Sequence, residues 1–516
     1  MIGRAMPRLP RCLALFVVLG FATPGMAAPR GKRARAPKVY TPPELEPEPA
    51  PEPAADVASV EIREDELPIL ARPERSPRLG AALRGARLPI RGQLDAGKGG
   101  GCASKRWYAL KPEGWICGAG VRPTKEPPDA RPALHVEKGE RVPFHYRHVL
   151  VGEGQSIPLY LSRADAEAKV EPWRKLERGD SLAVESTVTV HGEPHLVLVD
   201  GLVMPQKGTS DMDSASGWQG VEVGDKVTLP FGWVTRDEAR IYAEPDAKSK
   251  VVGTIDRRER VPLLEDREVE KVAEPEGAKK KSKKKSGPKR FVRIGEGRWL
   301  ESGDVNEVRL AARPAGTEGN DRWIDVDLGE QVLVAYEKER PVYATLVSSG
   351  RTLPTPRGTY RIWAKAATTN MKSQAYEDKE YFVHKVPWVL FFQAHNAIHA
   401  AYWHDRFGQK KSHGCVNVAP LDARHLFEWA TPALPDGWHG VRPVDLLRSI
   451  AVYIRDSHKS PAWVQDRPIG PPDKEEEKKK LEDAEKRRAA AADDAEKARG
   501  AAGAAGAAAP AVPAKP

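Results

Sequence analysis

A lone cysteine stands in a short polar stretch near the end of the chain. Residues 412–417 read SHGCVN, which places Cys415 two residues after His413 and two before Asn417. A thiol has a reference pKa of about 8.5, so it is mostly protonated at neutral pH and needs a nearby imidazole to attack a carbonyl. His413 would share a face with Cys415 in an extended segment, and His399 ends an apolar strand that could bring it opposite the thiol. The pattern indicates nucleophilic chemistry at Cys415.

Two neighbours of Cys415 suit the same chemistry. Gly414 leaves room for a substrate carbonyl, and the backbone N–H groups of Gly414 and Cys415 could stabilise an oxyanion. Asn417 carries an amide that can hydrogen-bond and order the loop. These residues would therefore shape the surroundings of the nucleophile.

Other fates of Cys415 are weaker. A packed, inert thiol is the usual fate of a lone cysteine, but the polar motif argues against it. In a zinc site, the possible ligands would be His395, His399, His404, Asp405, His413 and Cys415. No pair of them has a usual tight ligand spacing on one element. We therefore expect neither a metal nor another cofactor.

The N-terminus has the pattern of a secretory signal. Three arginines precede an apolar run at Leu13–Ala22, and small residues follow up to Ala28. We expect a signal peptide at 1–27, export to the periplasm or cell wall, and membrane contact only through the signal. Of the 4 cysteines, Cys12 would be lost with it. Cys102 and Cys117 flank a short aromatic segment and form the natural disulfide pair in an oxidising compartment, which leaves Cys415 free.

Length and charge limit the classes of function. A chain of 516 residues is too long for one core and suggests roughly three domains plus linkers. The net charge of +10 comes from the N-terminal arginines and from a lysine-rich run at 279–290, KKKSKKKSGPKR. Without these clusters the chain is close to neutral, so nucleic-acid binding through a broad basic face is not expected.

An internal echo indicates small β modules before the cysteine motif. RWYALKPEGWIC at 106–117 and RFVRIGEGRWLE at 290–301 each place an aromatic residue eight positions before a tryptophan, across a glycine-containing turn. This layout resembles bacterial Src-homology-3-like modules. The resemblance implies one or two small β-barrels at 85–225 and another at 228–311, interrupted by the lysine-rich insertion. The Cys102–Cys117 pair would staple the first module.

The flanks and the motif region complete a mainly β, multidomain organisation. A Pro/Glu-rich tether is expected at 28–80, and a C-terminal extension with a Lys/Glu/Ala-rich tail at 451–516. Between them, 320–450 would form a β-rich catalytic domain with few helices. Its first strands alternate and break at Glu337–Arg340, which predicts a hairpin, and only PLDARHLFEWA at 420–430 has a helical pattern.

The segment IHAAYWHDRFGQKKSHGCVN resembles the signature of the L,D-transpeptidase (YkuD-type) catalytic domain. In that family a histidine is followed, after a spacer, by Ser/Thr-His-Gly-Cys, a hydrophobic residue, and Asn or Arg. The opening hairpin and the turn in TPRGTYRI also resemble the family, so the resemblance covers about 321–450. It implies that Cys415 is the nucleophile and His399 its activating base. The second motif histidine is His413, and the loop-shaping positions are Ser412, Gly414 and Asn417.

The resemblance also implies the reaction. Cys415 would take the acyl group of a peptidoglycan tetrapeptide stem and expel the terminal D-alanine, and an acceptor amine would resolve the thioester. The acceptor could be a second stem, giving a cross-link, or a lipoprotein, giving attachment to the wall. Carboxypeptidase or endopeptidase activity and non-catalytic wall binding are the alternatives. Tyr402 is a candidate for the pocket wall or the core, and the carbonyl of Ala400 is expected to orient His399.

Overall fold

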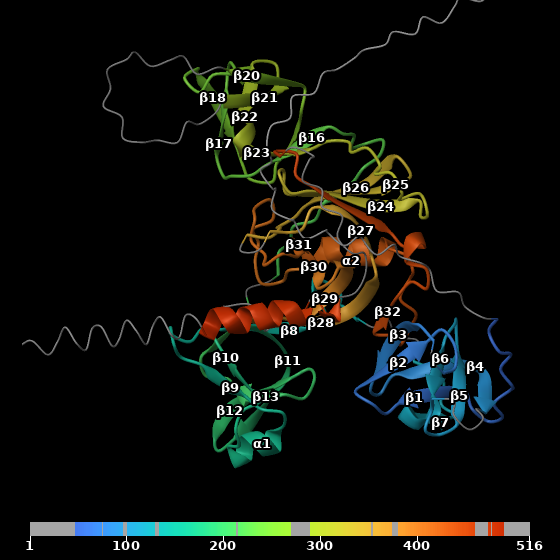
Figure 1. Ribbon diagram of the computed structural model, residues 1–516. Coiled ribbons are helices and arrows are strands. Elements are labelled where there is room, and N and C mark those ends of the chain that lie inside the picture. The colour runs from blue at the N-terminus through green and yellow to red at the C-terminus, as the bar shows by residue number, and fades with distance from the viewer. Residues whose placement is uncertain are drawn as a thin grey trace, which may run out of the picture. The chain divides into compact units, whose positions relative to one another are not determined.

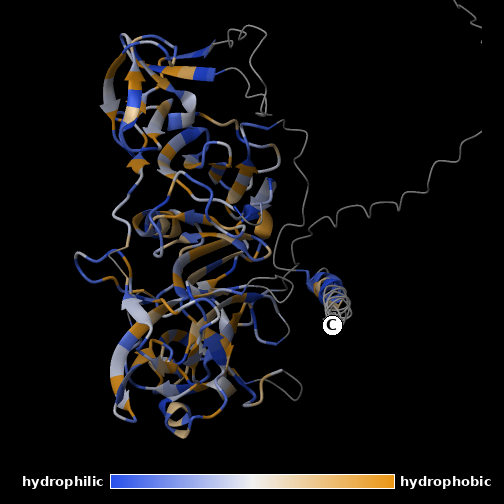
Figure 2. Ribbon diagram, turned by 90° about the vertical axis from the view of Figure 1, so that its left-hand side faces the viewer, coloured by the Kyte–Doolittle hydropathy of each residue, from blue (hydrophilic) through white to orange (hydrophobic). Residues whose placement is uncertain are grey.

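The computed structural model describes residues 47–74, 76–95, 101–129, 134–212, 215–269, 289–351, 354–373, 380–459, 473–475 and 477–489. The expected signal peptide, the lysine-rich insertion up to residue 288 and the end of the tail lie outside these residues. Strands dominate the described chain, which confirms a mainly β protein (Figure 1). Hydrophobic and hydrophilic residues share most strands, as half-buried sheets require (Figure 2). Among the described residues, no helix is long and apolar enough to span a membrane.

The first group of strands begins earlier than the sequence suggested. It comprises β1 (Ser59–Ile62), β2 (Glu66–Leu70), β3 (Arg78–Leu83), β4 (Arg87–Asp95), β5 (Arg106–Leu110), β6 (Trp115–Cys117), the 3₁₀ turn Gly118–Gly120 and β7 (Val121–Thr124). The expected tether at 28–80 is therefore wrong at its C-terminal end, because Val60, Ile62 and Ile69 are fully buried core residues. Short apolar runs between charged residues concealed these strands.

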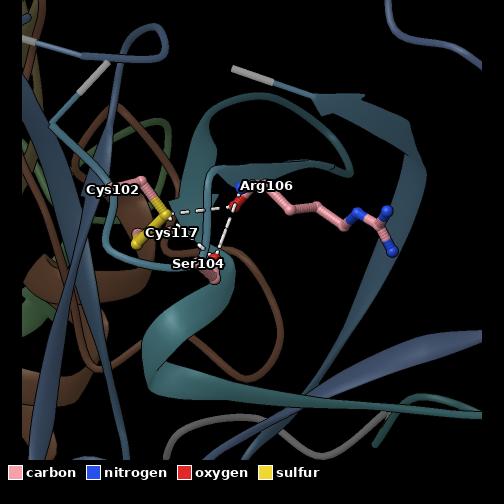
Figure 3. Close-up of a disulfide and its surroundings, with 4 residues drawn as sticks. All are labelled: Cys102, Ser104, Arg106 and Cys117. Atoms are coloured by element: carbon pink, nitrogen blue, oxygen red, sulfur yellow. Dashed lines mark hydrogen bonds between the residues drawn. A yellow bond between two sulfur atoms is a disulfide. The ribbon is translucent and has the colours of Figure 1, made fainter. Parts of the chain in front are cut away.

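The predicted Trp107–Trp115 hairpin is confirmed. β5 pairs with β6 antiparallel, and Gly114 takes φ +91° in the turn between them. Cys102 and Cys117 are joined by a disulfide with Cα atoms 5.4 Å apart (Figure 3). The strand order within the group is β7-β1-β4-β5-β6-β2-β3. No pairing of the described residues closes these strands into a barrel.

A second group follows the disulfide-linked one. Its elements are β8 (His145–Val149), β9 (Ile157–Leu159), helix α1 (Arg163–Ala168), β10 (Arg174–Leu176), β11 (Ser181–Val190), β12 (Glu193–Leu198), β13 (Val203–Pro205) and β14 (Thr209–Asp211). Helix α1 starts at Ser162, whose hydroxyl accepts a hydrogen bond from the Asp165 amide, and stops at Lys169 in the left-handed conformation. The apolar core of this group also includes Phe382, from later in the chain.

The third group contains the second repeated segment, residues 290–301. It comprises β16 (Phe231–Val234), β17 (Ala239–Tyr242), β18 (Val251–Ile255), β19 (Arg260–Pro262), β20 (Glu265–Val269), β21 (Lys289–Gly295), β22 (Arg298–Glu301), the 3₁₀ turn Ser302–Asp304 and β23 (Val305–Val308). β21 and β22 form the predicted hairpin. The strands divide into a 3-stranded and a 5-stranded sheet. The described pairings show no closed barrel, so the Src-homology-3-like interpretation stays a prediction.

The last group carries the cysteine motif. Its elements are β24 (Arg322–Asp327), β25 (Val332–Glu337), β26 (Arg340–Leu346), β27 (Gly358–Arg361), β28 (Ala364–Lys372), β29 (Phe382–Gln393), β30 (Asn396–Ala400), β31 (Val416–Val418), α2 (Pro420–Trp429), β32 (Gly440–Val441), the 3₁₀ turn Leu446–Arg448 and β33 (Ala451–Arg455). The hairpin β25–β26 and helix α2 confirm two sequence predictions. β15 (Val221–Glu222), from the preceding linker, joins this group by pairing with β26.

The C-terminal boundary at residue 450 is wrong. β33 lies between β24, with which it is parallel, and β27, with which it is antiparallel. Arg455 on this strand donates two hydrogen bonds to Asp325, at 2.8 and 2.9 Å, and one to Asp327 at 2.6 Å. Residues 451–455 are thus an inner strand of the sheet. The described part of the tail is helical at 474–475 and 477–489, and Glu477 contacts His395.

Candidate active site

Two parallel strands bring the distant parts of the motif together. β30 pairs with β31 so that Ile398 lies beside Val416, His399 beside Asn417 and Ala400 beside Val418. Since paired residues in a sheet share a face and successive residues alternate, this register fixes which side chains meet. The apolar members Ile398, Ala400, Val416 and Val418 all enter the main core with helix α2. His399 and Asn417 therefore lie together on the opposite face.

Cys415 lies at the entrance to β31. Continuing the register places it beside Ala397, which makes His399 its diagonal neighbour on the same face, and diagonal neighbours lie within reach of long side chains. The thiol forms no disulfide and is half-buried, and its Sγ is 3.8 Å from the His395 carbonyl oxygen, a weak hydrogen bond. The nucleophile predicted from the sequence is therefore reduced and partly accessible.

The loop before Cys415 is held by its own hydrogen bonds. The Ser412 hydroxyl donates to the Cys415 carbonyl at 2.6 Å and accepts from the Gly414 amide at 3.1 Å. Gly414 has φ +133°, a backbone conformation that residues with a side chain rarely adopt. Ser412 and Gly414 thus shape the loop. The Gly414 N–H donates to the Ser412 hydroxyl in this structure, and its expected part in binding an oxyanion stays a prediction.

A second segment supports this loop from the side. Ser348 and Asn417 exchange backbone hydrogen bonds at 2.8 and 3.0 Å, and the Ser349 carbonyl accepts from the amides of Lys411 and Ser412. Thr355, from the turn that the sequence associated with the family, donates to the Cys415 carbonyl at 3.5 Å and accepts from the Gly350 amide. Both sides of the cysteine loop are thereby anchored to backbone.

His399 has the geometry of a base with a fixed tautomer. Its Nδ1 is 2.9 Å from the carbonyl oxygen of Ala400. A carbonyl can only accept, so Nδ1 carries the hydrogen and Nε2 keeps a lone pair. The expected orientation by the Ala400 carbonyl is confirmed. His399 is only 2% exposed, and burial lowers its pKa to about 4. It is neutral at physiological pH and able to accept a proton.

The other two predicted residues have different surroundings. His413 is exposed and stacks on Tyr381, with ring centres 4.7 Å apart. Tyr402 is 2% exposed, stacks on Tyr146 at 3.6 Å and donates its hydroxyl to the His384 carbonyl at 2.7 Å. Tyr402 therefore belongs to the core, which was one of its two expected roles, and does not line an open pocket.

Sequence reasoning missed a segment that faces His399. Trp403 stacks on His399 with ring centres 5.9 Å apart, and His404 Nε2 is 3.1 Å from Asn417 Nδ2. The Ser348 hydroxyl donates to the Arg406 carbonyl at 2.8 Å. Trp403 and His404 also line a cavity of about 630 Å³ with Arg406 and others. In the sequence, the aromatic pair Tyr402–Trp403 shortly after His399 was the available signal for this segment. The contacts themselves form only in the folded chain.

Helix α2, which follows β31 directly, is fixed at both ends by buried charged groups. Asp422, in its first turn, accepts hydrogen bonds from Tyr343 (2.6 Å), Thr345 (2.5 Å) and the Gly220 amide (2.7 Å). Burial raises the Asp422 pKa to about 6 despite these donors. At the other end Lys365 donates to the carbonyls of Phe427, Ala430 and Pro432, where a helix favours positive charge. The helix thereby braces the motif strand.

The possible zinc ligands are occupied by separate partners. His399 binds Ala400, His404 contacts Asn417, and Asp405 binds Arg257, Arg258 and Ser216. No cluster of three or more metal-ligating side chains occurs among the residues that the structure describes.

The comparisons with known proteins point to the same region. Residues 321–445 match the family model YkuD, described as the L,D-transpeptidase catalytic domain. The family resemblance of this region is thereby confirmed. A comparison with curated proteins found no match.

Solved L,D-transpeptidase structures are similar over a limited part of the chain. A mutant of the Enterococcus faecium enzyme is 23% identical, with 26% of this chain and 49% of that chain covered and a TM-score of 0.21. An L,D-transpeptidase from Mycobacterium smegmatis is 17% identical, with 32% and 66% covered and a TM-score of 0.22. The catalytic domain of the E. faecium enzyme acylated by ertapenem is 24% identical, with 26% and 97% covered and a TM-score of 0.21. The chain thus spans about half of the first of these proteins.

Proposed function

We propose that the protein is a peptidoglycan L,D-transpeptidase that works through a Cys415 acyl-enzyme. The supporting observation is the parallel β30–β31 register, which puts His399 and Cys415 on one face of the sheet. Both residues lie in the region that matches the catalytic-domain family. His399 is the base, and Ser412 and Gly414 hold the cysteine loop. His413, exposed beside Tyr381, borders the approach to the thiol.

The first half-reaction forms a thioester. The imidazole of His399 is neutral in the resting enzyme, because its pKa is about 4. As the sulfur attacks the carbonyl of a tetrapeptide stem, its proton moves to His399 Nε2, whose lone pair is kept available by the Nδ1–H bond to Ala400. The tetrahedral intermediate then breaks its C–N bond, and the proton passes from His399 to the departing amine of D-alanine.

The second half-reaction consumes the thioester. An incoming amine gives up a proton to His399 Nε2, attacks the acyl carbon and releases the thiolate, which takes the proton back. An amine of a second stem gives a cross-link, an amine of a wall-anchored lipoprotein gives attachment, and water gives hydrolysis. The family match agrees with any of these acceptors. Export to the periplasm or cell wall, which the N-terminal pattern favours, would bring the enzyme to this substrate.

The test is mass spectrometry of muropeptides after incubation of purified wall with the full chain. Cross-linked products, with one D-alanine released for each cross-link, support transpeptidation. Shortened stems without cross-links identify a hydrolase. Ertapenem, which acylates the E. faecium catalytic domain, provides a substrate-independent check. If the protein binds purified wall but forms no adduct at Cys415 with the wall peptides or with ertapenem, it is a non-catalytic wall-binding protein.

A further inference from the structure

We infer that His404 is a positioning residue, which turns the Asn417 amide so that its N–H donors serve the reaction at Cys415. The inference rests on the proposed function for its catalytic consequence. Its structural part concerns two side chains of the resting protein. His404 lies five residues beyond the base and outside the cysteine motif.

The surroundings of His404 define its tautomer. The backbone amide of Arg406 donates to His404 Nδ1 at 3.2 Å. Nδ1 therefore carries a lone pair, and a neutral ring must carry its hydrogen on Nε2. The ring is neutral at physiological pH: burial, followed by the positive charge of Lys411, lowers its pKa to about 4. His404 thus presents an N–H donor toward Asn417.

The Asn417 amide must then present its oxygen to His404. Asn417 Nδ2 lies 3.1 Å from His404 Nε2, so that two N–H donors would face each other. Asn417 Oδ1 is buried without a protein partner among the described residues. The two ends of an amide have the same shape, so their assignment follows from the hydrogen bonds. Exchanging them gives an Nε2–H···Oδ1 bond and removes the donor–donor contact.

The exchange frees the amide nitrogen for chemistry. Asn417 is 2% exposed and shares a sheet face with His399 and Cys415. Its two N–H groups then occupy the position of the unpaired buried oxygen. A buried donor without a partner is costly, so it favours an acceptor brought by the substrate or formed in the reaction. The thiolate and the oxyanion of the tetrahedral intermediate are such acceptors.

The orientation can be measured on the resting enzyme. Long-range ¹H–¹⁵N correlation spectra of ¹⁵N-histidine-labelled full chain at pH 7 distinguish the two neutral tautomers and the imidazolium. We expect His404 to show the Nε2–H tautomer, identified by the loss of its signals in a His404→Gln variant. The Nδ1–H tautomer or an imidazolium at pH 7 overturns the inference. Because no substrate is involved, this result is independent of the proposed activity.

The catalytic consequence is tested with matched variants. A glutamine at 404 can place an amide N–H where Nε2–H lies, whereas phenylalanine keeps the ring and loses both nitrogens. We expect His404→Phe to lower kcat with a tetrapeptide stem about ten- to hundredfold with little change in KM. His404→Gln should recover most of that loss. The control is His425→Phe, a ring stacked on Tyr343, which should change kcat little. Equal kcat in wild type and His404→Phe contradicts the role of His404.

Discussion

The hairpin that holds Cys102–Cys117 and the loop that holds Cys415 use the same residue in opposite ways. In the hairpin, Cys117 ends β6, Cys102 is buried, and the disulfide is packed among aromatic residues including Trp107. In the loop, Cys415 forms no disulfide and is half-buried, and its backbone carbonyl accepts hydrogen bonds from Ser412 and Thr355. One site fixes the chain through sulfur. The other fixes the chain through backbone and leaves the sulfur available.

Under the proposed function, the difference separates a structural cysteine from a nucleophile. A disulfide mainly restricts the unfolded chain. A nucleophile needs access and a base held in the correct tautomer, which His399 and Ala400 supply. The cysteine motif is therefore held through the loop backbone and the base, and the thiol donates a weak hydrogen bond to the His395 carbonyl.

Removing the free sulfur should abolish the chemistry. Cys415→Ala leaves no atom to form a thioester, so we expect no covalent adduct with ertapenem by intact mass spectrometry. Circular dichroism should show a folded protein, since the loop is held by backbone hydrogen bonds to Ser412 and Thr355 that an alanine keeps. An adduct that persists in this variant would place the nucleophile elsewhere.

Removing the base should leave a slow reaction. His399→Ala is expected to lower the acylation rate by about 10²–10⁴, the usual size of general acid–base catalysis. His413→Ala should cost less, because His413 is exposed and stacked on Tyr381 rather than buried on the reacting face. The double variant with Cys415→Ala should be no worse than Cys415→Ala alone. Stopped-flow rates that show the reverse order would exchange the roles of the two histidines.

The backbone conformation of Gly414 should affect the acylation rate more than the small volume of this residue does. At φ +133° an added Cβ is strained, at a cost of about 1–3 kcal/mol, so Gly414→Ala should slow acylation about ten- to hundredfold as the loop shifts. The matched control is Gly303→Ala, where an added Cβ meets nothing within 4 Å. Equal acylation rates for Gly414→Ala and wild type would show that the loop tolerates another conformation.

The pH profile should report the buried base. Protonated His399 cannot accept the thiol proton, so the rate on the acid side follows its pKa. With a pKa of about 4 the base form is still almost complete at pH 6, whereas an ordinary histidine near 6.5 would already be mostly protonated. We expect the acylation rate constant, measured from pH 4 to 8, to show no acid limb with a midpoint near 6.5. Such a limb would contradict a buried, neutral His399.

The disulfide should affect stability and leave the chemistry unchanged. Replacing Cys102 and Cys117 together by serine should lower the free energy of unfolding of the first strand group by about 2–4 kcal/mol. The acylation rate at Cys415 should stay within about twofold of wild type, because the active-site contacts described here lie outside this hairpin. Denaturant titration and ertapenem labelling measure the two effects separately. A large loss of labelling would show that the contrast between the two regions is false.

Local patterns in the sequence predicted the elements but not all their partners. The two tryptophan hairpins, helix α2 and the β25–β26 turn follow from alternation, glycine and helical spacing, and all are present. β33 was missed because its five residues follow the predicted domain boundary at residue 450, where they were assigned to the C-terminal extension. From the sequence, His404 was considered only as a possible zinc ligand, since its partner Asn417 becomes a neighbour only when β30 and β31 pair.

The most direct test of the central claim is peptide mapping of the full chain after brief reaction with a purified disaccharide-tetrapeptide and acid quenching. The account predicts a stem-peptide thioester on Cys415, with one D-alanine released for each adduct and no adduct in Cys415→Ala. It also predicts that the adduct disappears when an acceptor amine is added. Release of D-alanine by wild type and Cys415→Ala at the same rate, or an adduct on another residue, would contradict the account.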